Sequence, residues 1–121
     1  LADAGNRERA LEIWRGILDA SDPGPELAGL VRVRIAQAEE AMGNWKAAAE
    51  AYAAAGADPA YPLWGWALAD AARAYVEAGD RAAAVRLAEQ VRAEAPDLAL
   101  PPHLAAQLEE LRAEGQAGAA S

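Results

Sequence analysis

The positions of the seven prolines restrict this chain to few folds, because they leave two long segments, 26–58 and 63–95, without any proline. Each segment is about 33 residues long, whereas an average globular helix has about 10–14 residues, so each suits two helices joined by a turn. Each is broken once, by Gly43-Asn44 and by Gly79-Asp80. Glycine after a helix end adopts the left-handed conformation easily, and the following Asn or Asp can cap the next helix.

Alanine makes up about 30% of the chain, and alanine is the strongest helix former. An all-α protein is therefore expected. Gly5-Asn6 resembles the two later glycine steps and predicts a third turn near the start. The predicted helices span about 6–20, 26–42, 44–56, 62–78, 80–94 and 102–113, and residues 115–121 are expected to form a flexible tail.

The three glycine steps recur at similar distances along the chain. Gly5 and Gly43 are 38 residues apart, and Gly43 and Gly79 are 36 apart. A helix–turn–helix unit that recurs at this period is too small to bury its apolar face alone, so the units must stack on one another.

The last unit resembles the tetratricopeptide repeat, whose pattern is W-x2-L-G-x2-Y, then A-x3-F, then Pro. Its pattern positions are occupied in order by Leu68, Ala71, Ala72, Tyr75, Ala84, Ala88 and Pro96. The middle unit keeps Ile35, Ala36, Gly43, Ala48 and Tyr52 but departs from the pattern at Arg32 and Glu39. The first unit keeps only Gly5, Ala10 and Trp14.

This resemblance implies a right-handed superhelical stack of antiparallel helix hairpins, a tetratricopeptide-like α-solenoid. The domain would span 1–114, with a partial repeat at 1–24, full repeats at 25–59 and 61–96, and a capping helix at 101–114. Small residues at Ala36, Ala48, Ala72 and Ala84 would let the two helices of each hairpin approach closely. The capping helix would turn Leu104, Leu108 and Leu111 inward.

A narrower resemblance is to the periplasmic ancillary subunit of the bacterial Sec translocon. It rests on the run Leu18-Asp19-Ala20-Ser21-Asp22, on residues 31–36 and on residues 63–68. That family has an N-terminal membrane anchor and a tetratricopeptide-like domain that binds translocon and chaperone partners. The resemblance therefore favours the periplasm over the cytoplasm, while the absence of cysteine fits both compartments.

In such a stack, the first helix of each hairpin lines a concave groove, where a protein or peptide partner would bind. Trp64 and Trp66 are two residues apart, about 200° around a helix, so Trp64 is expected inside and Trp66 outside. The predicted groove residues are Leu30, Val33, Gln37, Glu40, Trp66, Ala69, Arg73 and Val76. With only Arg73 basic among them, these residues fit a partner segment with apolar and basic side chains better than a peptide carboxylate.

The composition argues against several other functions. The net charge of −8, from 19 acidic and 11 basic residues, disfavours nucleic acid. With no cysteine and one histidine, and no phosphate-binding glycine motif, the sequence offers no cofactor or metal site and no catalytic set. The pairs Glu39-Glu40 and Glu109-Glu110 are expected to be solvated helix faces. No stretch is apolar enough for a membrane span.

The leading hypothesis is a non-catalytic interaction module that serves as a scaffold or adaptor. Two alternatives remain open from the sequence. One is a cytosolic regulatory tetratricopeptide region of a larger signalling or transcription protein. The other is a structural domain that forms homo-oligomers, because no cap precedes the first helix, whose outer face is left to another surface.

Overall fold

The computed structural model describes residues 2–20 and 23–120, so Ser21 and Asp22, part of one motif above, lie outside the described residues. Those residues contain helices and no strand, which confirms the all-α prediction. The helices are α1 (Ala2–Ala20), α2 (Pro25–Ala41), α3 (Trp45–Gly56), α4 (Trp64–Glu77), α5 (Arg81–Glu94) and α6 (Pro102–Ala120).

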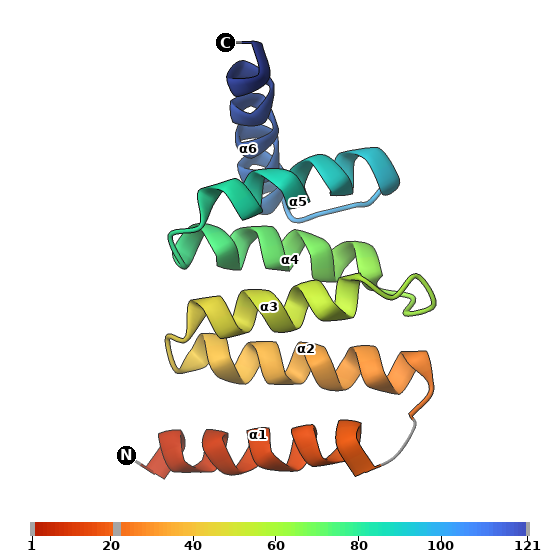
Figure 1. The fold of residues 1–121 in the computed structure, drawn as a ribbon, viewed down its shortest axis with the longest axis vertical. Coiled ribbons are helices and arrows are strands. Elements are labelled where there is room, and N and C mark those ends of the chain that lie inside the picture. Colours follow the sequence, from red (N-terminus) through yellow and green to blue (C-terminus); the bar gives the residue numbers. More distant parts are fainter. Residues whose placement is uncertain (1, 21–22, 121) are drawn as a thin grey trace.

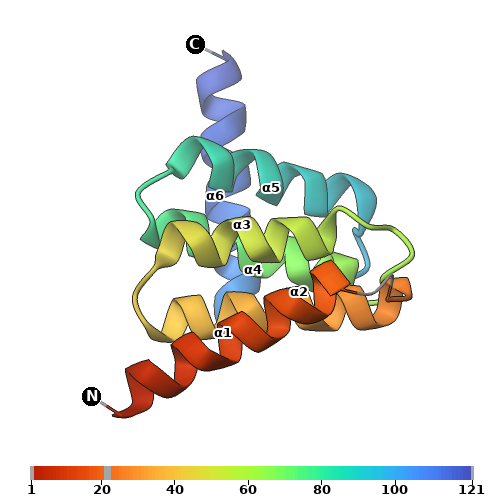
Figure 2. The ribbon, with the colours of Figure 1, turned by 60° about the horizontal axis from the view of Figure 1, so that its bottom comes forward.

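Helices α1 to α5 lie side by side in chain order, and each runs opposite to the one before it (Figure 1). Every helix packs against the next one, and two further contacts join α2 to α4 and α4 to α6. Helix α6 turns out of this row, and its C-terminal end projects beyond α5 in both views (Figures 1 and 2). The result is a stack in which α4 touches the largest number of neighbouring helices.

Two of the predicted glycine turns are present. Gly43 and Gly79 have φ angles of 79° and 84°, in the left-handed region. The next residue donates its backbone N–H to the carbonyl five positions earlier, from Asn44 to Glu39 at 2.9 Å and from Asp80 to Tyr75 at 3.0 Å. This is the Schellman ending of a helix, which satisfies carbonyls that would otherwise lack a partner.

The third predicted turn is wrong. Gly5 lies inside α1, which already begins at Ala2, and no described glycine other than Gly43 and Gly79 has a positive φ. A single glycine costs a helix only about 1 kcal/mol relative to alanine. The surrounding helix formers outweigh that cost, so the first helix continues through Gly5.

The predicted alanine seams are confirmed. Ala36, Ala48, Ala72 and Ala84 are all completely buried. Ala36 and Ala48 share one apolar cluster with Tyr52, while Ala72 and Ala84 share another with Leu68. A methyl group at each of these positions lets neighbouring helices pack closely, and larger side chains fill the flanks.

Helix α6 covers the end of the stack as predicted, with Leu104, Leu108 and Leu111 buried in the cluster formed with α4 and α5. It does not end near residue 114, however, but continues to Ala120, so residues 115–120 of the segment expected as a tail are helical, and Ser121 lies outside the described residues. Gly115 lies so close to α5 that a Cβ atom there would overlap Glu89 and Val85. The ion pair of Arg81 with Glu114, with Arg81 Nε 2.9 Å from Oε2, joins the same two helices.

Candidate functional site: the α2–α4 face

The predicted groove residues of α2 share one side of that helix. Leu30 is 45% exposed and Gln37 is exposed, while Val33 and Glu40 are half-buried. On α4, Trp66 remains 37% exposed, whereas Trp64 packs against two apolar clusters. The two tryptophans therefore point in different directions, as expected from their spacing.

An apolar cavity lies between these two helices. It has a volume of about 450 Å³ and is lined by residues of α2, of the loop between α3 and α4, and of α4. The lining residues are Val33, Tyr61, Leu63, Trp66, Ala67 and Asp70. We call this cavity and the exposed Leu30 beside Val33 on α2 the α2–α4 face.

The loop between α3 and α4 forms one wall of the cavity and is held by its own hydrogen bonds. The Tyr61 N–H donates to the carbonyl of Asp58 at 3.0 Å, and the Trp64 N–H donates to the carbonyl of Tyr61 at 3.1 Å. The Tyr61 ring lies against Gly29 of α2, where a Cβ atom would be only 2.2 Å from its Cδ1. Glycine at position 29 thus makes room for the ring, and burial raises the pKa of the Tyr61 hydroxyl.

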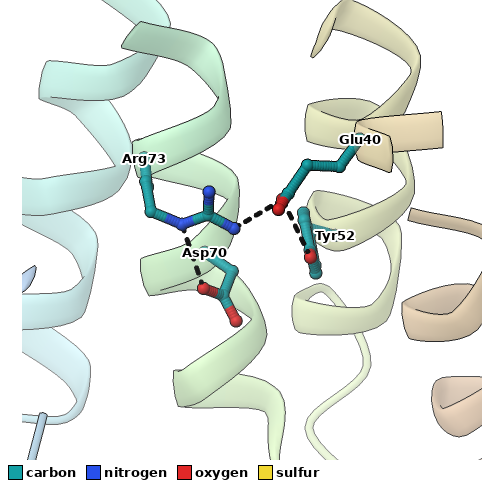
Figure 3. Close-up of polar contacts among 4 residues, drawn as sticks. All are labelled: Glu40, Tyr52, Asp70 and Arg73. Atoms are coloured by element: carbon teal, nitrogen blue, oxygen red, sulfur yellow. Dashed lines mark hydrogen bonds and ion pairs between the residues drawn. The ribbon is translucent and has the colours of Figure 1, made fainter. Parts of the chain in front are cut away.

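Next to the cavity, four polar side chains from three helices meet (Figure 3). The Arg73 guanidinium lies 2.6 Å from Glu40 Oε1 through one terminal nitrogen, and its Nε lies 3.4 Å from Asp70 Oδ1. The Tyr52 hydroxyl donates to the same Glu40 oxygen at 3.2 Å. Arg73 also lies 5.9 Å from the centre of the Tyr52 ring, within range of a cation–π contact.

This polar cluster carries one negative charge in excess, since Glu40 and Asp70 share a single cation. Burial raises the pKa of Asp70; the charge and hydrogen bond of Arg73 lower it in part, and Glu40 raises it further. Burial, aided by the charges of Glu40 and Asp70, raises the pKa of Tyr52 well above its ordinary value. Burial lowers the pKa of Arg73, but its bond to Glu40 and the neighbouring charges raise it overall.

Two predicted groove residues lie elsewhere. Ala69 is completely buried in the cluster that α4 forms with α5 and α6, and Val76 is half-buried against the same cluster. The reason is that α6 packs on α4 as well as on α5 and so covers this side of α4. From Trp66, the open side of α4 continues at Asp70 and Arg73 instead, at the i+4 and i+7 positions.

The acidic pair Glu39-Glu40 is not a solvated face. Glu39 is only 5% exposed, and its two carboxylate oxygens accept hydrogen bonds from Arg15 and from the Asn44 side chain, both at 3.0 Å. Asn44 therefore does not cap α3 with its side chain, whereas the Asp80 carboxylate caps α5 by accepting from the Ala83 N–H at 3.1 Å. Glu39, which departs from the repeat pattern, joins α1 to the turn after α2.

The groove prediction missed four residues of the cavity lining and the hydroxyl of Tyr52; the four are Tyr61, Leu63, Ala67 and Asp70. Asp70 had a signal, since it lies one helical turn after Trp66. Tyr61 and Leu63 flank Pro62 in a loop, where helical periodicity does not indicate which way a side chain points.

Among the described side chains, no group of three or more His, Cys, Asp or Glu is arranged to hold a metal ion. No helix in the described part of the chain has the length and apolar character needed to cross a bilayer.

Comparison with known proteins gives no assignment. No protein-family model matches the chain, and searches of curated proteins and of solved structures likewise give no match.

Proposed function

We propose that this chain is a non-catalytic interaction module that binds a segment of another polypeptide on the α2–α4 face. The observation that carries the proposal is the apolar cavity rimmed by exposed side chains. Leu63 is 52% exposed there, beside Trp66 and close to a half-buried arginine. Exposed apolar surface of this kind marks interaction sites, and tryptophan and arginine dominate the energetics of many interfaces.

We further propose that the stack is a tetratricopeptide-like α-solenoid with a right-handed superhelix. Three features support this: the repeated glycine turn, the alanine seams inside the hairpins, and the contacts between alternate helices, α2 with α4 and α4 with α6. In a solenoid of hairpins, the first helices of successive units line one side. The α2–α4 face would then be the inner, concave surface.

The proposal that the chain acts in the periplasm as part of the Sec translocon is supported by the sequence resemblance alone. The alternative is a regulatory region of a larger cytosolic protein. The coding sequence upstream of this segment in the same gene distinguishes the two proposals. A single membrane span encoded there supports the first, and a signalling or DNA-binding domain supports the second.

Site-specific photocrosslinking in the source cell tests the binding proposal. A photoreactive residue is introduced at Trp66, at Leu30, or at Arg86, an exposed residue of α5 that does not line the cavity. We expect the same protein to be captured from positions 66 and 30 and not from 86. Equal capture from all three positions, or from none, would contradict binding on this face.

A second candidate function, self-association, is favoured by one observation on α1. Ile13 is 58% exposed, and α1 packs only against α2 among the described helices. If α1 forms a contact between two copies, then Ile13→Glu dissociates the oligomer in analytical ultracentrifugation. A domain that sediments as a monomer at high concentration would rule this function out.

A further inference from the structure

The lining of the apolar cavity includes one charged group, Asp70. Its Oδ1 is 3.4 Å from Arg73 Nε, a long contact for a charged pair, and Oδ2 has no hydrogen-bond partner among the described residues. The guanidinium is held more closely by Glu40, at 2.6 Å. Asp70 is therefore the carboxylate that carries the excess negative charge of the polar cluster.

A ligand that covers the cavity must also cover Asp70. An apolar segment without charge would remove water from the free oxygen and replace it with nothing, and a carboxylate deprived of its hydrogen bonds is strongly unfavourable. An acidic segment would be repelled by Asp70 and Glu40 and by a chain whose net charge is −8. A cationic side chain beside the cavity would form an ion pair with Asp70, and its positive charge is complementary to the negative charge of the whole chain.

We propose that the partner segment carries a large apolar side chain next to a lysine or arginine, and that the cation pairs with Asp70 while the apolar side chain fills the cavity. This inference rests on the proposed binding function and specifies its ligand. In a helical segment, the two side chains would be three or four residues apart, and in an extended segment two residues apart, so that both face the same surface.

A peptide selection tests the pairing without knowledge of the natural partner. A displayed library of random dodecamer peptides is selected on the immobilised chain, and enriched sequences are synthesised for measurement of Kd. Binding is compared for wild type and for the charge variants Asp70→Asn and Asp97→Asn, and Trp66→Ala tests whether each peptide occupies the cavity. Asp97 is an exposed residue between α5 and α6, so the two variants change the net charge equally but only one changes the cavity.

We expect enriched peptides to combine a large apolar residue with Lys or Arg within four positions. Asp70→Asn should weaken their binding about tenfold, as expected for a charge-assisted hydrogen bond, and Asp97→Asn should leave it unchanged. The same pair is tested from the ligand by replacing the peptide's Lys or Arg with Gln, which needs no altered protein. The Gln-containing peptide should bind wild type about tenfold more weakly than the original peptide does, and the two peptides should bind Asp70→Asn with equal affinity.

The outcomes separate the two proposals. Peptides that bind in a Trp66-dependent manner but carry no enriched basic residue, or that bind Asp70→Asn and Asp97→Asn equally, would overturn the pairing with Asp70 and leave the binding function in place. A selection that enriches no peptide, or only peptides that bind Trp66→Ala as tightly as wild type, would overturn the binding function of this face.

Discussion

Helix α4 has two sides that lie in different surroundings. One side carries Ala69 and Val76 and packs into the cluster closed by α6. The other carries Trp66 and Asp70, which line a cavity open to solvent. The covered side is uncharged, although Trp64 and Tyr75 at its edge carry polar atoms, whereas the open side combines an exposed tryptophan with a charge that lacks a full set of partners. The difference separates residues that stabilise the fold from residues available to a ligand.

The covered side should give the largest loss of stability. Leu111 is almost completely buried in the cluster beneath α6. Leu111→Ala should lower the free energy of unfolding by about 2–5 kcal/mol, because it removes apolar contacts and leaves a cavity. Urea denaturation measures the effect, and a loss below about 1 kcal/mol would show that α6 is not an integral part of the stack.

The two neighbouring tryptophans compare the sides directly. Trp64 packs against two core clusters, while Trp66 belongs to neither. We expect Trp64→Ala to cost about 2–4 kcal/mol and Trp66→Ala about 1 kcal/mol, while only the second variant abolishes binding of a selected peptide. The comparison fails if Trp66→Ala is the more destabilising of the two in thermal denaturation.

Overpacking of the hairpin seam should have a smaller effect. Ala72 is completely buried in the cluster that also contains Ala84. Ala72→Leu should cost about 1–3 kcal/mol, because the added atoms force the helices apart. The exposed Ala82→Leu is the control and should change stability by less than about 0.5 kcal/mol. An Ala72→Leu variant as stable as wild type would contradict close packing at this seam.

The smallest change in the free energy of unfolding is expected for a substitution of Asp70, and this substitution should stabilise the chain, whereas the others destabilise it. Because the pKa of Asp70 is raised in the folded state, the native chain holds this proton more tightly than the unfolded chain. The stability linked to the proton is fully present below the ordinary pKa of 3.8 and is lost as the pH rises through the raised value. Asp70→Asn should therefore be slightly more stable than wild type near pH 7, a difference that shrinks toward about pH 4.

Chemical denaturation at both pH values measures this difference, with Asp97→Asn as the control for net charge. If Asp70→Asn is the less stable variant near neutral pH, then the carboxylate stabilises the fold and its incomplete pairing is not a cost.

The sequence predicted what local rules determine. Gly43 and Gly79 end helices through backbone geometry that the next residue completes, and the buried alanines follow the helical period. Gly5 misled because a glycine indicates a turn only where the neighbouring residues stop favouring a helix, and here they do not.

The remaining errors concern contacts between distant parts of the chain. The sequence does not show that α6 covers Ala69, or that Arg15 on α1 reaches Glu39. Tyr61 is a further case, since its position depends on the space above Gly29 in another helix. Periodicity assigns a residue to one side of its own helix and does not say which neighbour covers that side.

The cavity lies where one hairpin meets the next: its walls come from α2, from the loop after α3 and from α4. A ligand bound there would contact two consecutive helical hairpins at the same time and would hold them together. In a linear array, the coupling between adjacent units governs how cooperatively the whole array melts. Ligand binding would therefore change the thermal unfolding of the entire domain, which would occur at a higher temperature and over a narrower range.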